Sequence, residues 1–477
     1  MRTIRHYIDL QARERAERPY LIAPESGRVL SYGQLAAEAR KLCGWLHAEG
    51  LRPGERVGFY CGNGRQAALV FLGAMYGGFV SVPLNLLAQP SQLEYVIMHS
   101  GVRVVFADRE NALRVAGHGV RVIVIDVDAD SLFTGREGRP AAPAEDAPCL
   151  LMYTSGTTGR PKGCLHTQKS VISGALYVQQ AHALTERDRV LSSLPLYHIN
   201  GQIVATVGPL VQGASSVAPR RFSVSQFWEQ LARYECTWFN VVPTIISYLV
   251  AGTDNGGRDV SRVRFGRSAS APLPPELHRE FERKFGISII ETMGMTETAA
   301  PIFSNPLEQS KRKYGSVGLP VGNEARVVQG EIQVRGDNLM REYYRDAEQT
   351  AQAFTADGWL RTGDLGHVDP DGFYFITGRL KELIIKGGEN IAPREIDDAL
   401  YKHPAVLEAA AVGIPDAHYG QEILAAVVLK PGVRASEAEL RAFCERELGR
   451  YKTPKQFRFM NELPKGPSGK VQRLKLL

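Results

Sequence analysis

Helical and strand-like patterns of apolar residues alternate along the first part of the chain. Apolar positions at helical spacing predict a helix over residues 32–50, which Gly50 ends, and a second helix over residues 67–76. Between them, the apolar run at residues 56–61 predicts a buried strand. Helices and strands that alternate in this way are typical of an α/β fold with parallel sheets.

One long uncharged stretch, at residues 67–84, is almost long enough to cross a bilayer as a helix. Gly77 and Gly78 interrupt it, however, and Pro83 lies close to its end. A buried helix followed by a buried strand explains this pattern better than a membrane span does. We therefore expect no membrane span.

The pattern changes near residue 380. Two apparent strands, joined by the turn DPDG at residues 369–372, precede this point. After it, the sequence predicts a strand, a helix, two strands, a second helix and a basic tail. We interpret this last part as a separate small α+β domain.

Composition and charge narrow the class of protein. The 477 residues are 44% hydrophobic and 23% charged, as in an ordinary globular protein, and carry a formal net charge of +6. The 57 lysines and arginines are spread along the chain, which fits a small anionic substrate better than a nucleic acid. The six cysteines form no CxxC pair and the N-terminus lacks the apolar core of a signal peptide, so we expect reduced thiols and a cytoplasmic location.

The segment GNGRQA, at residues 62–67, follows a predicted strand and opens a predicted helix, as a dinucleotide-binding turn does. The next predicted strand, FVSVPLN, ends without the Asp or Glu that would bind a ribose. A dehydrogenase is therefore not favoured.

The sharpest local signal is YTSGTTGRPKG at residues 153–163, placed after the apolar run CLLMY and before a predicted helix. Its three glycines, four hydroxyl side chains and Lys162 can surround phosphate oxygens with N–H and O–H donors and one positive charge. No Gly-Lys-Ser/Thr stands at the Walker A offset, so the loop is not of that kind. The alternative is a polar surface turn, and so many donors beside a lysine disfavour it.

This loop resembles the signature of the adenylate-forming superfamily, which includes acyl-CoA synthetases, peptide-synthetase adenylation domains and firefly luciferase. Five more segments resemble its motifs, in the same order: PLYHINGQ (195–202), ETMGMTET (291–298), GWLRTGDLG (358–366), GRLKELIIKGGENIAP (378–393) and LPKGPSGKVQR (463–473). The resemblance implies a large N-terminal domain over residues 1–378, built of layered α/β subdomains with parallel sheets and a β-barrel-like part. It also implies a hinge at residues 379–381 and a small, mobile α+β domain over residues 382–477.

The same resemblance implies an ATP site. Glu297 would bind magnesium and Thr296 would contact a phosphate, whereas a carboxylate at Asp364 offers the two acceptors that a ribose diol needs. Arg379 would lie near the ribose and phosphates, and Lys470 would contact the substrate carboxylate and the α-phosphate. The residues expected at ATP are Thr154, Ser155, Gly156, Thr157, Thr158, Gly159, Lys162, Thr292, Met293, Gly294, Met295, Thr296, Asp364, Arg379 and Lys470. Without the resemblance, Glu297 and Lys470 would pass for solvated surface charges.

Further positions follow from the resemblance for the acyl group, for CoA and for the hinge. His198 would gate the passage between the acyl site and the pantetheine channel, and Lys381 stands at the hinge position. The expected acyl pocket comprises His198, Asn200, Gln202, Asn240, Pro243, Ser270, Ala271 and Ala299. The expected CoA channel comprises Gly387, Gly388 and Glu389, because a thin pantetheine arm must pass close to the backbone there.

One position departs from the superfamily pattern. Met293 stands where an aromatic residue usually stacks on adenine. A thioether can still pack on a ring face, so an adenine site remains consistent with the sequence.

We therefore predict an ATP-dependent acyl-CoA synthetase that needs Mg²⁺. Its expected catalytic residues are Lys162, His198, Thr296, Glu297 and Lys470. The expected substrate is a small or medium-sized acid, and aromatic acids are among the candidates. Because the sequence stops seven residues after Lys470, no carrier domain is expected and free CoA is the simpler acceptor. A ligase that loads a separate carrier protein, a luciferase-like oxygenase and a silent nucleotide-binding regulator stay open as alternatives, and so does a homodimer.

Overall fold

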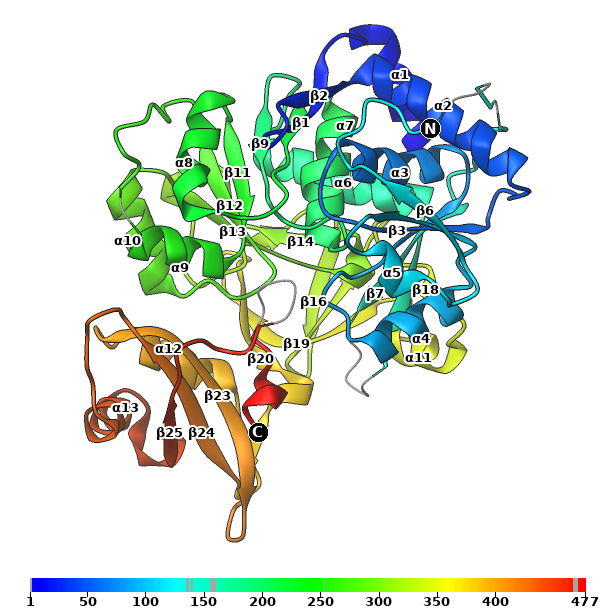
Figure 1. Cartoon of the computed structure of the whole chain (residues 1–477). Coiled ribbons are helices and arrows are strands. Elements are labelled where there is room, and N and C mark those ends of the chain that lie inside the picture. The colour runs from blue at the N-terminus through cyan, green and yellow to red at the C-terminus, as the bar shows by residue number, and fades with distance from the viewer. Residues whose placement is uncertain (1, 134–136, 139, 155–159, 253, 466–470) are drawn as a thin grey trace.

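The computed structural model describes residues 2–133, 137–138, 140–154, 160–252, 254–465 and 471–477. Within these residues the chain forms four β-sheets with helices packed on them (Figure 1). The fold is mixed α/β, with a large N-terminal part of parallel and mixed sheets and a small C-terminal unit, as predicted.

A seven-stranded sheet has the strand order β18-β8-β7-β4-β3-β5-β6. Five neighbouring strands, β7, β4, β3, β5 and β6, pair in parallel. The pairs β7–β8 and β8–β18 are antiparallel. The strands are β3 (Arg56–Tyr60), β4 (Val80–Pro83), β5 (Val104–Asp108), β6 (Arg121–Ile125), β7 (Pro148–Thr154), β8 (Lys162–Thr167) and β18 (Glu342–Tyr343). The helices of this region are α1 (Ile4–Arg15), α2 (Tyr32–Ala48), α3 (Arg65–Tyr76), α4 (Pro90–Ser100) and α5 (Ala112–Val115).

The elements predicted in the first part of the chain are confirmed as α2, β3 and α3, although α3 begins at Arg65 rather than at residue 67. Every residue of α3 is buried and β4 follows it, so the uncharged stretch is a buried helix and strand, as predicted. Among the described residues, none of the helices has both the length and the apolar character that a membrane span requires.

The surroundings of the 153–163 loop differ from the prediction in one respect. A helix was expected directly after the loop, but β8 comes first and returns antiparallel to β7, and only then does α6 (Gln168–His182) begin. The segment KGCLHT can form this strand because Cys164 and Leu165 bury small and apolar side chains in the sheet. Thr167 then caps α6 by accepting a hydrogen bond from the Ser170 N–H.

A nine-stranded sheet has the order β15-β14-β13-β12-β11-β9-β10-β1-β2, and its six strands from β13 to β1 pair in parallel. The strands are β1 (Pro19–Ala23), β2 (Arg28–Ser31), β9 (Arg189–Leu191), β10 (Ser215–Val217), β11 (Trp238–Val241), β12 (Phe265–Ser268), β13 (Ile289–Met295), β14 (Ala300–Ser304) and β15 (Leu319–Pro320). The helices are a π-helix, η1 (Asn200–Val207), then α7 (Gly208–Gln212), α8 (Val224–Arg233), α9 (Pro243–Ala251) and α10 (Pro275–Phe285). The carboxyl ends of β11, β12 and β13 meet at one edge, where ligands of parallel α/β sheets bind.

A separate four-stranded antiparallel sheet has the order β16-β17-β19-β20. Its strands are β16 (Glu324–Val328), β17 (Glu331–Arg335), β19 (Leu360–Val368) and β20 (Tyr374–Arg379). The predicted DPDG turn joins β19 to β20, and Gly372 N–H donates to the carbonyl of Asp369 at 3.0 Å. Short helices nearby are η2 (Thr296–Thr298), η3 (Gln309–Lys311) and α11 (Ala347–Ala353).

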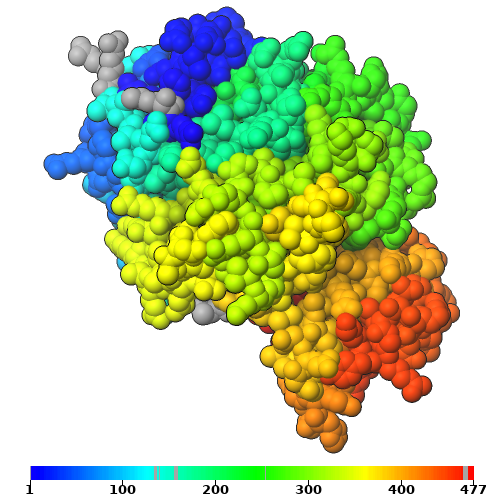
Figure 2. Space-filling view, turned by 180° about the vertical axis from the view of Figure 1, so that it is seen from behind, coloured from blue at the N-terminus to red at the C-terminus, as the bar shows by residue number. Residues whose placement is uncertain are grey.

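The C-terminal unit contains the pattern of strands and helices predicted after residue 380. Its elements are η4 (Leu380–Glu382), β21 (Ile384–Lys386), β22 (Glu389–Ile391), α12 (Pro393–Tyr401), β23 (Val406–Asp416), β24 (Gly420–Leu429), α13 (Glu437–Lys452), β25 (Gln456–Phe459) and η5 (Arg473–Leu476). Figure 1 places this unit, in orange and red, below α9 and α10, and Figure 2 shows from behind that it projects from the larger part. The bounds 1–378, 379–381 and 382–477 stay predictions.

Candidate active site

A cleft lies between the C-terminal unit and the edge where the nine-stranded and four-stranded sheets meet. One wall comes from the turn after β12, from β13 and from β19 and β20, and the other from α12 and β23. The residues predicted for the ATP site or the acyl pocket that line it are Pro243, Ser270, Ala271, Thr292, Met293, Gly294, Asp364 and Arg379. Segments more than a hundred residues apart in sequence therefore converge on one cleft.

Asp364 and Arg379 face each other across two neighbouring strands. They are register partners in the β19–β20 ladder, and Arg379 Nε lies 2.7 Å from Asp364 Oδ1. Asp364 is buried, whereas two-fifths of the Arg379 side chain is exposed. Burial alone would lower the pKa of Arg379, but the charges of Asp364 and Glu382 and the hydrogen bond to Asp364 together more than offset this and raise it. The pair presents a fixed carboxylate and a cation to the cleft.

Lys162 and Glu297, 135 residues apart, both lie against Tyr343. The Tyr343 hydroxyl donates a hydrogen bond to Glu297 Oε1 at 2.8 Å, and Lys162 Nζ lies 4.9 Å from the centre of the Tyr343 ring. Lys162 also donates to Gln349 Oε1. Burial, and then the charge of Glu297, raise the pKa of Tyr343, so its hydroxyl keeps the proton that it donates. Tyr343 and Gln349 were missed because a lone tyrosine or glutamine in a polar segment carries no local signal.

Thr296 is held by a histidine that the sequence did not indicate. His166 Nε2 lies 2.7 Å from the carbonyl oxygen of Thr296, and its Nδ1 lies 3.2 Å from Ser170 Oγ. Burial lowers the pKa of His166 to about 4, so the ring is neutral at pH 7 and its Nε2–H is the donor. This contact fixes the backbone beside Glu297.

Three residues predicted for the acyl pocket form a hydrogen-bonded cluster with Arg267. Asn200 Nδ2 donates to Ser270 Oγ at 3.1 Å, and Asn240 Nδ2 donates to Asn200 Oδ1 at 3.0 Å. Arg267 Nη1 donates to Asn200 Oδ1 at 3.0 Å and to Asn240 Oδ1 at 2.9 Å. Arg267 was missed, although a charged residue inside the strand FGRS was a signal that could have found it.

Among the other expected acyl-pocket residues, Pro243 and Ala271 line the cleft, whereas His198, Gln202 and Ala299 are not part of its lining. Gln202 is fully buried, and its Nε2 donates to the carbonyl of Leu196 at 2.5 Å, which holds the turn before the π-helix. Ala299 is buried with φ of 42°. The His198 ring is partly buried, and its centre lies 4.9 Å from that of the Tyr197 ring. Their roles stay predictions.

The residues expected at adenine and at the phosphates are placed as follows. Met293 and Met295 are half-buried on β13, and Thr292 Oγ1 donates to the carbonyl of Ser268 at 3.3 Å. Gly294 passes so close to β14 that a Cβ there would lie 1.8 Å from the carbonyl oxygen of Ala300. Thr154 ends β7 opposite Lys162. Ser155, Gly156, Thr157, Thr158, Gly159 and Lys470 lie outside the described residues.

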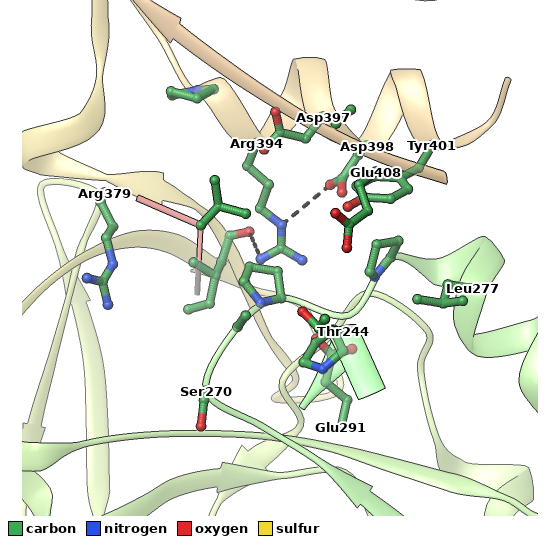
Figure 3. A pocket seen from close by; sticks show the side chains of 18 of the residues that line it. Thr244, Ser270, Leu277, Glu291, Arg379, Arg394, Asp397, Asp398, Tyr401 and Glu408 are labelled. Atoms are coloured by element: carbon green, nitrogen blue, oxygen red, sulfur yellow. Dashed lines mark hydrogen bonds and ion pairs between the residues drawn. The ribbon is translucent and has the colours of Figure 1, made fainter. Parts of the chain in front are cut away.

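The C-terminal unit turns a charged face to the cleft (Figure 3). On α12, Arg394 Nε lies 3.4 Å from Asp398 Oδ2, and its Nη1 donates to the carbonyl of Ile376 in β20 at 2.7 Å. Lys465 and Val471, which flank the segment that contains Lys470, also line the cleft.

The glycines expected in the CoA channel lie elsewhere on this unit. Gly387 and Gly388 form the turn between β21 and β22, with φ of 56° and 87°, and Glu389 begins β22. Two successive positive φ values are typical of a tight hairpin turn, and they favour glycine. Lys381 lies exposed in η4. The residues that line the cleft in the described conformation do not include this turn.

Comparison with known proteins identifies the class. The AMP-binding enzyme family matches residues 8–344, and the AMP-binding enzyme C-terminal domain matches residues 395–470. The chain belongs to this family, that is, to the adenylate-forming superfamily.

Individual relatives indicate which reaction the protein catalyses. The chain is 54% identical over 497 aligned residues to the sulfoacetate–CoA ligase of Cupriavidus necator, which covers 100% of this chain and 97% of that protein. It is 32% identical to the oxalate–CoA ligase of Arabidopsis thaliana, over 89% of this chain and 88% of that one. The anthranilate CoA ligase AuaEII in complex with anthranoyl-AMP superimposes with a TM-score of 0.90 at 28% identity, over 99% and 96% of the two chains. The protein is an AMP-forming acid–CoA ligase, which joins a carboxylic acid to CoA through an acyl-adenylate, and this confirms the predicted activity.

Proposed function

We propose that this ligase activates a small acid that carries a second anionic group, with sulfoacetate as the first candidate. The observation that carries the proposal is the 54% identity to a sulfoacetate–CoA ligase across the whole chain. The 32% identity to an oxalate–CoA ligase supports the same class, because oxalate also carries two anionic groups. The polar cluster of Asn200, Asn240, Arg267 and Ser270 suits such an acid better than a long apolar chain.

The substrate test is a panel of acids scored by CoA-dependent AMP formation, with each acid also assayed without CoA as the control. We expect the kcat/KM for sulfoacetate to exceed that for propionate and benzoate by at least about a hundredfold, since a site built for a polar group rejects analogues that lack it. A higher value for propionate or benzoate would contradict the proposal.

In the first half-reaction the substrate carboxylate attacks the α-phosphate of ATP, and pyrophosphate leaves. No protein nucleophile is needed, so the residues act by positioning the reactants and neutralising charge. We assign the phosphates to the 154–163 loop and Lys162, the ribose to Asp364 and Arg379, and adenine to the β13 segment around Met293. The salt bridge between Asp364 and Arg379 at the cleft supports this assignment. In the second half-reaction the CoA thiolate attacks the acyl carbonyl, and AMP leaves.

We also propose that Glu297 binds the Mg²⁺ that accompanies ATP. The described residues contain no group of three His, Cys, Asp or Glu side chains that could hold a metal, and Mg²⁺ in nucleotide enzymes is commonly held by one or two carboxylates and the phosphates. Glu297 fits that use because it is a largely buried carboxylate whose Oε1 is oriented by the Tyr343 hydroxyl. Bound Mg²⁺ would neutralise charge that develops on the phosphate oxygens.

Glu297→Gln should raise the Mg²⁺ concentration for half-maximal activity by at least about tenfold, because the amide keeps the shape but lacks the charge. A Mg²⁺ titration of pyrophosphate release measures the change. The matched control is Glu348→Gln, at an exposed glutamate on α11. An unchanged titration for Glu297→Gln would remove this residue from the metal site.

Met293→Tyr tests the adenine site. A tyrosine would restore the usual aromatic partner, and a stacked ring is worth about 1 kcal/mol, so the KM for ATP should stay the same or fall by up to about fivefold. The ranking of acids should not change. Met98→Tyr, at a methionine that is 65% exposed, is the control. A large rise in the KM for ATP would show that Met293 does not lie on the adenine.

We propose that residues 1–378 and 382–477 act as two domains and that the smaller one rotates about Lys381 between the half-reactions. The described arrangement suits adenylation, because the segment flanking Lys470 lines the cleft while the Gly387–Gly388 turn does not. Rotation would exchange these two features, so that Gly387, Gly388 and Glu389 border the pantetheine path. His198 would then separate the acyl site from that path.

A further inference from the structure

Arg267 lies on β12, an interior strand of the nine-stranded sheet, opposite Asn240 of β11. It is 2% exposed, which makes it one of the largest fully buried side chains. Burial of a guanidinium is costly unless something compensates its charge. Burial lowers the pKa of Arg267 to about 9, so the side chain is still a cation at pH 7.

Within the described residues, every hydrogen bond that Arg267 donates goes to a neutral group. Its Nη1 donates to the amide oxygens of Asn200 and Asn240, and its buried Nε has no partner among those residues. Other buried arginines differ: Arg65, also 2% exposed, lies 2.8 Å from Asp130, and Arg394 lies 3.4 Å from Asp398. Arg267 is thus held in position without being neutralised.

The titratable groups nearest to Arg267 in the fold do not neutralise its charge. Glu291 on the neighbouring strand pairs in register with Ser268, one residue beyond Arg267, so the two side chains point to opposite faces of the sheet. Glu291 Oε1 instead accepts a hydrogen bond from the Leu273 N–H. Burial, and then the charge of Arg267, hold the pKa of His182 well below its usual value, so His182 is neutral. The charge of Arg267 therefore has no counter-charge in this part of the described chain.

Ser270 connects this buried charge to the cleft. It lines the cleft and also accepts the hydrogen bond from Asn200 Nδ2. Figure 3 shows the Ser270 hydroxyl directed away from Arg394 and the C-terminal unit, toward the larger part of the protein. A continuous polar path therefore leads from the cleft wall inward. It consists of Ser270, Asn200, Asn240 and Arg267, and we call these four residues the arginine cluster.

We propose that Arg267 binds the distal anionic group, a sulfonate or a second carboxylate, of the acid that this ligase activates. The inference rests on the proposed substrate class. The planar guanidinium can donate two parallel hydrogen bonds to either oxyanion, and the substrate would supply the counter-charge that the protein omits. The neutral amides of Asn200 and Asn240 hold the cation without competing for its charge. The reacting carboxylate is left free at the cleft end, where ATP binds.

The sharpest test is Asn200→Asp. The change keeps the shape of the side chain and places a carboxylate oxygen where Asn200 Oδ1 now accepts from Arg267, and the Ser270 hydroxyl can reverse to donate to the other oxygen. An internal ion pair would then replace the one that the substrate is proposed to make. The ratio of kcat/KM for sulfoacetate to kcat/KM for propionate should fall by about a hundredfold or more. The control is Asn255→Asp, which adds the same charge at a partly exposed position outside this cluster.

Arg267→Met is the second variant, since it removes the charge but keeps an unbranched side chain. Both ratios, for sulfoacetate and for malonate against propionate, are measured in the wild type and the two variants, with the melting temperature of each protein. A collapse of the ratios in either folded variant supports the proposal. Equal losses for all three acids would assign Arg267 a structural role and overturn it.

The wild-type acid panel distinguishes failure of the proposed substrate class from failure of the proposed role of Arg267. A wild-type preference for propionate would defeat the proposed substrate class and this inference with it. A wild-type preference for sulfoacetate or malonate that survives in Asn200→Asp and Arg267→Met would leave the substrate class intact and refute the role of Arg267 alone.

Discussion

Lys470→Ala should slow adenylate formation by about a hundredfold to a thousandfold, the usual cost of removing one preorganised charge from a transition state. It should nevertheless still convert a supplied acyl-adenylate and CoA to the thioester. The reason is that Lys470 is proposed to neutralise the carboxylate and the α-phosphate only while ATP is attacked. Lys465 and Val471, on either side of its segment, line the cleft, which supports this position.

The two half-reactions are measured separately, by pyrophosphate release and by consumption of the acyl-adenylate. Lys475→Ala is the matched control, because Lys475 is an exposed lysine of the same C-terminal tail. Both half-reactions should proceed normally in that variant. Equal loss of both in Lys470→Ala would mean that Lys470 is needed throughout the cycle and would contradict the proposed domain rotation.

Gly388→Leu should produce the opposite defect. A bulky side chain at the β21–β22 turn would obstruct the proposed pantetheine path, and a displacement of about 1 Å at a reacting centre can cost on the order of a hundredfold in rate. Thioester formation should therefore fall by about that factor while pyrophosphate release is retained. The described arrangement supports this separation, since Gly387 and Gly388 lie off the cleft wall.

The control for Gly388→Leu must carry the same backbone strain. Gly388 has a φ of 87°, which disfavours leucine whatever the available space, and no atom lies within 4 Å of a Cβ built there. Gly432, in the turn between β24 and α13, matches it with a φ of 74° and equally open surroundings. Gly432→Leu should therefore lose similar stability but keep both half-reactions. If the two leucine variants showed the same kinetic defect, strain rather than obstruction would explain it.

Several features of this protein could be predicted from the sequence because they depend on local order along the chain. The helical and alternating apolar patterns predicted α2, β3, α3 and the elements of the C-terminal unit, since residues that repeat every 3.6 or 2 positions share one face. The glycines, hydroxyls and lysine of the 153–163 loop, with five motifs in the order of a known superfamily, predicted an acid–CoA ligase. Such signals need no knowledge of which distant segments meet.

Other features were decided by the tertiary structure. The strand β8 after the loop, the π-helix at Asn200, the contact of Tyr343 with Glu297 and the arginine cluster all depend on packing between distant segments. Arg267 and Asn200 lie 67 residues apart, and only the order of the strands and the seating of η1 on the sheet bring them together. The charge of Arg267 is readable in the sequence, but whether a carboxylate neutralises it depends on which residues become its neighbours. That choice belongs to the fold, because electrostatic and hydrogen-bond energies depend on distances in space and not on separation along the chain.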